Sequence, residues 1–269
     1  MRSTRSFPRR EHPPVSSLRA RCPNCRTFTA VAVGDGYECH SCGSIFPAGL
    51  VRVPAAWGSG GEGMVEGARI EVPYPEVAVV ERPSLDEQTE AIVDALASRP
   101  VVLGGCCCAH VGAATGVARR VDRLAVVWID SHGDLNTPES SPSGNLWGMP
   151  FRMLLDDGVV APEDAALVGA RNLDPPEEEY MASVGLDSSL ERALEGVGAT
   201  YVALDLDVLD PAEVDVLIPE PDGLSPDELE SLLRDLAGRT TIVGMGVTGL
   251  LATERNAVLA TRMLAAAGF

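Results

Sequence analysis

The chain has 269 residues, 45% of them hydrophobic, which suits one sizeable core or a core with a small extra module. No apolar run approaches the roughly 20 residues of a membrane span, and no apolar segment follows the N-terminal arginines as it would in a secretory signal. We therefore expect a cytoplasmic protein. The formal net charge of −18 argues against broad nucleic-acid binding by the body of the chain.

The N-terminal residues differ in charge from the rest of the chain. Residues 1–17 are rich in arginine, serine and proline and show no hydrophobic periodicity, which predicts a disordered basic arm. The alternative is an arm that contacts phosphate groups. A nucleic-acid-binding protein led by this arm is a further alternative, which rests on the arm alone.

Four cysteines within residues 18–50 form two Cys-x-x-Cys pairs separated by thirteen residues. They are Cys22, Cys25, Cys39 and Cys42. Two such pairs can bind one Zn²⁺ through four thiolates, and β-prone residues with a glycine turn between the pairs place them on hairpins. The pattern predicts a zinc ribbon with one structural zinc. The alternative is four reduced cysteines without a metal.

Residues 51–75, which include a glycine-rich stretch and several prolines, indicate a linker that enters the main domain. From residue 76 to residue 269 strands and helices alternate, which is typical of an α/β domain with a parallel sheet covered on both faces. Strands are predicted at 76–81, 101–105, 124–130, 165–170, 200–207 and 240–247, and helices at 86–97, 108–119, 149–156, 176–183, 188–196, 226–236 and 256–267.

Polar side chains gather where two of these strands end. Asp130, His132 and Asp134 follow one predicted strand, and Asp205 and Asp207 close another. A spacing of two places each group on one face of an extended chain, and parallel sheets bind ligands at the carboxyl ends of their strands. Four carboxylates and an imidazole together predict two divalent cations that activate a shared water, and hence metal-assisted hydrolysis. The alternative is an acidic, solvated turn.

These motifs resemble the arginase/agmatinase (ureohydrolase) family. The resemblance covers roughly residues 76–269 and rests on Gly104-Gly105 before a helix, on the sequence DSHGD at 130–134, on the loop 136–145, and on DLDVLDP at 205–211. It implies a three-layer, arginase/deacetylase-like parallel sheet and a binuclear manganese centre. In that family a metal-bridging hydroxide attacks a trigonal carbon, usually that of a guanidinium group. The resemblance also implies a small-molecule substrate and a homo-oligomer.

The resemblance suggests a role for each residue. Asp130 and Asp205 would bridge the two ions, Asp134 would complete one site, and His132 with Asp207 would complete the other. Asp134 is also assigned to catalysis. Four residues would line the substrate pocket: Asn136, Ser143, Asn145 and Trp147.

The chain departs from the family at three places, of which the first concerns a metal ligand. After the second predicted strand the family has a metal-binding histidine, whereas this chain has Cys107. A thiolate there would shift the ion preference from manganese toward zinc or iron. Two alternatives stay open: residues 106–108 only pack the strand end, or His110, one turn further along, is the ligand.

The other two departures concern proton transfer and substrate charge. Trp147 stands where the family has a proton-shuttling histidine. An indole cannot exchange protons near neutral pH, and it would narrow the pocket or stack on a planar or cationic substrate. Residues 243–250 contain no acid where arginases carry a glutamate that pairs with the guanidinium, and Glu254 is the nearest carboxylate along the chain. This argues against a guanidinium substrate such as arginine.

We therefore predict a metal-dependent hydrolase that cleaves a non-peptide C–N bond in a guanidino-, amidino- or amide-type substrate. The alternative is a catalytically inactive arginase-like protein that binds a ligand or a protein partner, with the zinc ribbon and basic arm as docking elements. Retention of five ligand residues favours the enzyme. Loss of the histidine and the glutamate favours the inactive protein.

Overall fold

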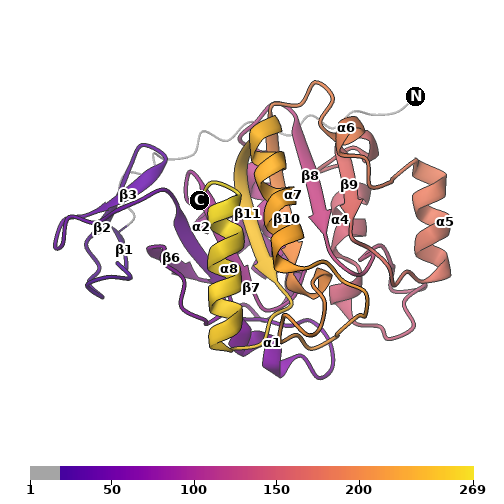
Figure 1. The fold of residues 1–269 in the computed structure, drawn as a ribbon, viewed down its shortest axis with the longest axis horizontal. Coiled ribbons are helices and arrows are strands. Elements are labelled where there is room, and N and C mark those ends of the chain that lie inside the picture. Colours follow the sequence, from indigo (N-terminus) through magenta and orange to yellow (C-terminus); the bar gives the residue numbers. More distant parts are fainter. Residues whose placement is uncertain (1–18) are drawn as a thin grey trace.

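The computed structural model describes residues 19–269, so the arm expected over residues 1–17 lies outside the described residues. The main body is a seven-stranded sheet in which all neighbouring strands are parallel (Figure 1). Across the sheet the strands are β6 (Glu76–Val79), β5 (Gly49–Val53), β7 (Pro100–Gly104), β11 (Thr241–Thr248), β10 (Ala199–Asp205), β8 (Leu124–Ile129) and β9 (Ala165–Val168). The expected α/β fold is confirmed.

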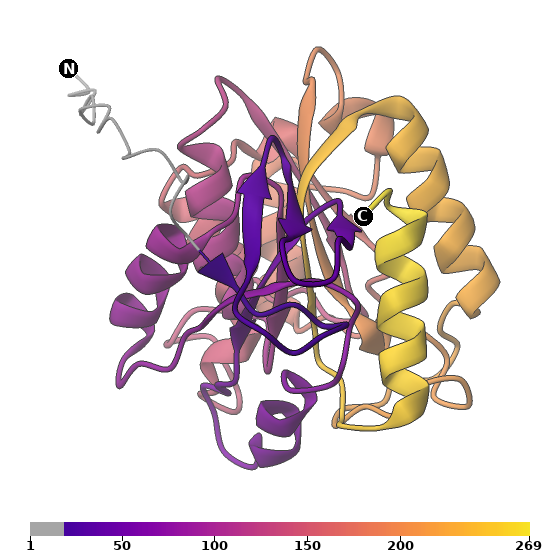
Figure 2. The same cartoon turned by 90° about the vertical axis from the view of Figure 1, so that its left-hand side faces the viewer.

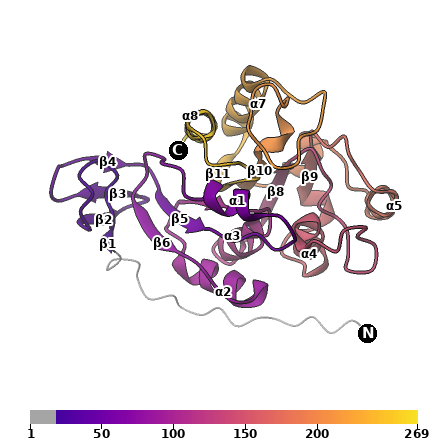
Figure 3. The same ribbon diagram turned by 90° about the horizontal axis from the view of Figure 1, so that it is seen from below.

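Helices cover both faces of this sheet, with α7 (Pro226–Arg239) and α8 (Glu254–Ala266) on one side and α2 (Leu85–Ala95), α3 (Ala109–Ala118) and α4 (Pro150–Asp156) on the other (Figure 3). The remaining helical segments are α1 (Glu62–Gly67), α5 (Pro175–Val184), α6 (Leu190–Ala193) and the 3-10 turns η1 (Leu146–Gly148), η2 (Pro162–Asp164) and η3 (Leu206–Val208). Within residues 19–269 no helix combines the length and apolarity needed to cross a membrane.

The strands divide their side chains between two hydrophobic cores. Val101 and Leu103 of β7 pack in the core under α7 and α8, whereas Val102 between them packs in the core under α2 and α3. Side chains of a strand alternate between faces, and here both faces are covered. This explains why the strands read as continuous apolar runs in the sequence.

Two covering helices begin at Ser-x-x-Glu sequences, which predict capping boxes; the box is complete at Ser225 and half-formed at Ser84. Ser225 accepts the backbone N–H of Glu228, whose carboxylate in turn accepts the backbone N–H of Ser225, which is a complete capping box ahead of α7. Ser84 accepts the backbone N–H of Glu87 at the start of α2. These caps fix where the covering helices begin.

The segment expected to be a linker, residues 51–75, differs from that expectation. β5 begins at Gly49, is buried along its whole length and pairs in parallel with both β6 and β7. A five-residue strand followed by proline- and glycine-rich sequence gives too short a pattern to stand out. The large sheet therefore begins at residue 49 rather than 76.

A small antiparallel sheet precedes the main body (Figure 2). Its strands are β1 (Arg19–Ala20), β2 (Ala30–Val33), β3 (Gly36–Cys39) and β4 (Ile45–Phe46), in that order. Arg21 and Glu76 exchange backbone hydrogen bonds of 2.8 and 3.0 Å, which joins the end of β1 to β6. The small sheet is therefore attached to the edge of the large one.

Candidate metal centre

A pocket of about 240 Å³ opens where four neighbouring strands, β7, β11, β10 and β8, reach their carboxyl ends. Residues far apart in the sequence meet here because the ends of parallel strands lie at one edge of the sheet. Every metal ligand expected from the sequence lines this pocket: Cys107, Asp130, His132, Asp134, Asp205 and Asp207.

In each acidic motif, the first aspartate accepts a backbone hydrogen bond that shapes the local turn. Asp130 Oδ1 accepts the backbone N–H of His132 at 2.8 Å, and Asp205 Oδ1 accepts that of Asp207 at 2.9 Å. An aspartate that binds the backbone two residues further on makes a tight turn. Asp134 follows with a φ of +54°, outside the extended region. The ligands converge as expected, but through turns rather than through alternation along a strand.

The first set of candidate ligands consists of Cys107, Asp130 and Asp205, whose ligand atoms lie within 4.8 Å of one another. Cys107 Sγ is 2.9 Å from Asp205 Oδ2 and 3.8 Å from Asp130 Oδ2. Burial raises the pKa of the Cys107 thiol well above its usual value, so a thiolate here requires a cation beside it. One thiolate and two carboxylates in this arrangement can share one divalent ion.

The second set consists of Asp130, His132 and Asp207, again within 4.8 Å of one another. His132 Nδ1 is 3.0 Å from Asp207 Oδ2, and its Nε2 is 3.4 Å from Glu220 Oε1. A carboxylate on the outer nitrogen orients a metal-binding imidazole. Asp130 belongs to both sets, which suits the bridging role expected of it, whereas Asp205 belongs to the first set only.

Asp134 brings a buried oxygen without a hydrogen-bond partner into the same pocket. Within residues 19–269, only Asp134 Oδ2 and the Tyr37 hydroxyl are buried side-chain oxygens or nitrogens left unpaired. Folded proteins rarely leave such an atom unsatisfied, and a cation beside Asp134 would satisfy it. Carboxylates, an imidazole and a thiol form a donor set that fits two divalent cations.

In the absence of a cation, burial favours the protonated form of these carboxyl groups. Burial raises the pKa of Asp205 to about 7 and that of Asp134 well above its usual range. Burial also lowers the pKa of His132, but hydrogen bonds to Asp130 and Asp207 outweigh burial and raise it to about 12. The histidine thus supplies the positive charge among four carboxylates. Divalent cations binding here would displace these protons.

The residues expected to bind substrate, Asn136, Ser143, Asn145 and Trp147, all line the pocket. Their polar groups are largely engaged within the protein. Asn136 Nδ2 donates to Asp174 Oδ2 at 2.8 Å, and Asn145 Oδ1 accepts the Ser59 N–H at 3.0 Å. These side chains therefore form a rigid mouth rather than a set of free hydrogen-bonding groups.

Trp147 is held by the glycine-rich stretch that sequence reasoning assigned to a linker. A Cβ atom added at Gly58 would lie 2.5 Å from Cζ3 of the indole, and one at Gly61 would lie 2.9 Å from it. Glycine is required where backbone approaches a ring this closely. Residues 58–61 thus support one wall of the pocket.

Sequence reasoning missed a group of wall residues: Met64, Asn172, Asp174, Glu177 and Ile218. Asp174 and Glu177 form the capping box of α5, a signal readable in the sequence Asp-Pro-Pro-Glu. Both Glu177 oxygens accept backbone N–H groups, from Leu135 at 2.8 Å and from Asp174 at 2.9 Å. Met64 and Ile218 come from segments with no pattern that points to a site.

The structure also bears on two of the departures from the family pattern. His110 is buried against Tyr201 and Thr248 and does not line the pocket, so the alternative in which it replaces the missing ligand has no geometric support. Gly249 has a φ of +78°, and a Cβ there would lie 1.9 Å from Asp205 Oδ1. No side chain fits at that position, and Glu254 lies outside the pocket wall.

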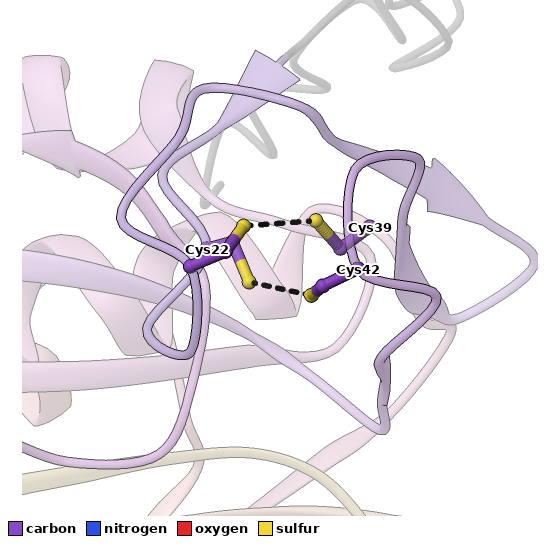
Figure 4. A group of neighbouring side chains, drawn as sticks. Cys22, Cys39 and Cys42 are labelled. Atoms are coloured by element: carbon purple, nitrogen blue, oxygen red, sulfur yellow. Dashed lines mark hydrogen bonds between the residues drawn. The ribbon is translucent and has the colours of Figure 1, made fainter.

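The four ribbon cysteines converge on one point, as Figure 4 shows for Cys22, Cys39 and Cys42. All four sulfurs lie within 4.8 Å of one another, with Cys22 and Cys42 at 3.7 Å and Cys25 and Cys39 at 3.5 Å. The two pairs turn alike: Arg26 and Gly43 both have positive φ and both donate their N–H to the carbonyl of the cysteine four residues before. The geometry is compatible with a zinc ribbon.

Together, the fold and the two ligand sets define an α/β protein with a candidate binuclear metal site at its strand ends. A model of the Arginase family matches residues 64–267, and the chain belongs to this family. The cysteine cluster precedes the matched residues.

Similar proteins agree with this assignment. Arginase from Bacillus subtilis (strain 168) is 36% identical over 142 residues, which cover 48% of this chain and 48% of that protein, so the chain spans about half the length of this relative. The crystal structure of arginase from Bacillus subtilis has a TM-score of 0.71 at 23% identity, over 82% of this chain and 97% of that one. Formimidoylglutamase from Bacillus subtilis subsp. subtilis str. 168 reaches 0.65 at 17% identity, over 82% and 85%. Both structural likenesses show the fold.

Proposed function

We propose that this chain is a metal-dependent hydrolase that cleaves a non-peptide C–N bond. The observation that carries the proposal is the pair of overlapping ligand sets that share Asp130, beside the unpaired oxygen of Asp134. Four buried carboxylates would repel one another by several kcal/mol at an effective dielectric constant of about 20, so cations explain why they stand together. Membership of the Arginase family supports the reaction class.

The proposal assigns one ion to Cys107, Asp130, Asp134 and Asp205, and the other to Asp130, His132 and Asp207. The family resemblance adds Asp205 as a second bridging residue. When bound, the two cations supply Lewis acidity and lower the pKa of water enough for attack near neutral pH. The family resemblance favours manganese. We propose that the Cys107 thiolate shifts the ion preference of its site from manganese toward zinc or iron.

The pocket wall favours a substrate that is uncharged at the scissile group. Apart from the ligand sets and Asp134, its carboxylates are Asp174 and Glu177, and both already accept hydrogen bonds within the protein. A buried guanidinium without an anionic partner would be costly. An amide or a neutral amidine therefore fits better than arginine.

Proton transfer has to follow a route that avoids residue 147, because the indole of Trp147 has no exchangeable proton near neutral pH. Asp134 Oδ2 has no hydrogen-bond partner in the pocket, and a carboxylate oxygen beside a cation keeps a second lone pair. We propose that a proton released by the attacking water is held at this atom. This gives Asp134 its catalytic role beside its role as a ligand.

A second candidate function is a catalytically inactive arginase-like protein that binds a partner through the zinc ribbon. Trp147 at the position of a proton shuttle and the absence of a side chain at Gly249 favour it. Zinc in the ribbon, a homo-oligomer, a protein partner and a cytoplasmic location stay predictions under either function.

Metal analysis and an activity screen test the proposal together. After loading with manganese or zinc, the purified protein should hold more than one ion per chain, and Asp205→Ala should lose core metal while keeping the ribbon zinc. Asp235→Ala, which removes an exposed carboxylate on α7, is the matched control. The loaded protein should release urea or ammonia from members of a panel of guanidino, amidino and amide compounds.

The outcomes separate the two functions. A protein that takes up only the ribbon zinc after loading would contradict the metal centre itself. A protein that holds the core ions but releases nothing from any compound of the panel would favour the inactive binding protein.

A further inference from the structure

Three buried polar side chains form a chain of hydrogen bonds directly behind the candidate metal centre. Tyr201 of β10, His110 of α3 and Thr248 of β11 are each fully buried. The Tyr201 hydroxyl is 2.9 Å from His110 Nδ1, and His110 Nε2 is 3.1 Å from Thr248 Oγ1. Thr248 Oγ1 in turn donates to Asp205 Oδ2 at 3.1 Å. The chain thus ends on a candidate ligand.

The position of His110 is fixed by what surrounds it. Its ring lies edge-on to Trp128 and to Tyr201, with centroids 5.1 and 6.0 Å away. A Cβ added at Gly246 would lie 2.5 Å from both His110 Nδ1 and the Tyr201 hydroxyl, so glycine is required there to make room for the pair. The imidazole can therefore neither swing away nor reach the pocket.

The hydrogen bonds can run in only one direction if Asp205 is to receive one. A threonine hydroxyl has a single proton, and Thr248 Oγ1 lies 3.1 Å from Asp205 Oδ2 and 3.4 Å from the Leu204 carbonyl oxygen. The carboxylate is the nearer and the charged acceptor, and a Thr248 that donates to either oxygen accepts from His110 Nε2–H. His110 Nδ1 is then the acceptor for Tyr201 O–H. Burial lowers the pKa of His110 to about 3, so the ring is neutral and carries this one proton.

Such a chain serves Asp205 more than it serves packing. Burying three polar groups in a core costs free energy that only complete hydrogen bonding recovers, whereas apolar residues would fill the same space at no such cost. Asp205 Oδ2 accepts from Thr248 and from Cys107, which lies 2.9 Å away. The bond from Thr248, which does not line the pocket, restrains rotation of the carboxylate.

We propose that Tyr201, His110 and Thr248 form a positioning relay that orients the Asp205 carboxylate toward the cation it shares with Cys107, with Tyr201 setting the direction of the relay. This inference rests on the proposed metal centre. Without the Tyr201 hydroxyl, the His110 proton is free to move to Nδ1. Thr248 would then donate to Nε2, and Asp205 would lose its hydrogen bond although no neighbour of Asp205 had been changed.

Two variants of the full-length chain test the relay, each with a matched control. Tyr201→Phe removes the hydroxyl that starts the chain, and its control is Tyr37→Phe, which removes a buried hydroxyl that has no partner. Thr248→Val removes the last link, and its control is Thr200→Val, which removes a buried hydroxyl bonded to Thr240 at the other end of β10. Tyr201→Phe keeps the test decisive if Thr248→Val does not fold.

Two measurements read out the result. Long-range ¹H–¹⁵N spectra of the zinc-loaded chain, in which Asp205 is ionised and which contains four histidines, report which nitrogen of His110 carries the proton. The electron paramagnetic resonance signal of free Mn²⁺ reports affinity at the core without interference from the ribbon, because four thiolates bind Mn²⁺ poorly. Loss of an outer partner of a ligand typically weakens metal binding about 10- to 100-fold.

We expect the Nε2–H tautomer in the wild-type chain and in both controls, with unchanged Mn²⁺ affinity in the controls. Tyr201→Phe should populate the Nδ1–H tautomer and weaken Mn²⁺ binding about 10-fold, and Thr248→Val should weaken it about 10- to 100-fold. An Nδ1–H tautomer in the wild type, or variants that bind Mn²⁺ as their controls do, would overturn the relay alone. A wild-type chain that binds no Mn²⁺ would overturn the metal centre and the relay with it.

Discussion

Asp205 should make the metal-free protein less stable as the pH rises. Burial raises the pKa of this carboxyl from 3.8 to about 7. Between pH 4 and pH 7 the folded chain therefore keeps a proton that the unfolded chain has released, so the free energy of unfolding falls as the pH rises. At about 1.36 kcal/mol per pH unit, the loss from this one group reaches about 4 kcal/mol at pH 7 and does not grow further above it.

The variant Asp205→Asn isolates this effect because it removes the titrating group. Urea unfolding of both chains, stripped of metal and followed by circular dichroism from pH 4 to pH 8, gives the free energy of unfolding at each pH. The variant minus the wild type should rise by about 4 kcal/mol from pH 4 to pH 7 and then level off. Only this slope is diagnostic, since asparagine also alters the hydrogen bonds with Thr248 and Cys107.

A flat difference between pH 4 and pH 7 would refute the reasoning, because it would mean that Asp205 ionises in the folded protein as easily as in the unfolded chain. Asp235→Asn, which removes an exposed carboxylate on α7, is the surface control measured alongside it. Mn²⁺ at 100 times its dissociation constant should restore about 2.7 kcal/mol per ion to the wild type at pH 8, and much less to Asp205→Asn.

Three further predictions concern single residues. Cys107→His should shift the preference of the core from zinc toward manganese by about 10-fold or more, as measured by competition between the two ions; an unchanged ratio would mean that Cys107 is not a ligand. Trp147→His should raise the turnover of any substrate found in the panel by about 100-fold. The pH dependence of turnover should gain an ionisation at about pH 6.5, that of an ordinary imidazole. An unaltered pH profile would contradict the assignment of this position to proton transfer. Cys42→Ser should remove the ribbon zinc and leave the core ions in place, and elemental analysis showing loss of both would disprove the separation of the two sites.

The sequence predicts the alternation of strands and helices well, because each buried strand is a short apolar run and the caps at Ser84 and Ser225 are local signals. It also predicts which candidate ligands meet, since Asp130 and Asp205 each follow an apolar run directly. The spacing of two between the candidate ligands has a different physical cause from the expected alternation of side chains along a strand. Each aspartate closes a turn onto the residue two positions further on, and such a turn is not readable from alternation.

What the sequence does not predict depends on contacts between distant segments. Glu220 reaches His132 across 88 positions, and Gly58 supports Trp147 from a stretch that reads as a linker. The sequence also does not show whether His110 is a ligand or lies one layer behind the candidate ligands, because that depends on the orientation of its side chain. Composition and periodicity carry no information on orientation.

The bonds between Arg21 and Glu76 give the small sheet a consequence for the whole protein. β6 is the outermost strand on its side of the large sheet, and an uncovered edge strand is a template on which another chain can add a strand. The small sheet covers part of that edge, and the zinc that we predict for its four cysteines would stabilise its fold. Zinc in the ribbon would therefore keep the sheet from growing into aggregates, a protective task that requires neither a substrate nor a partner.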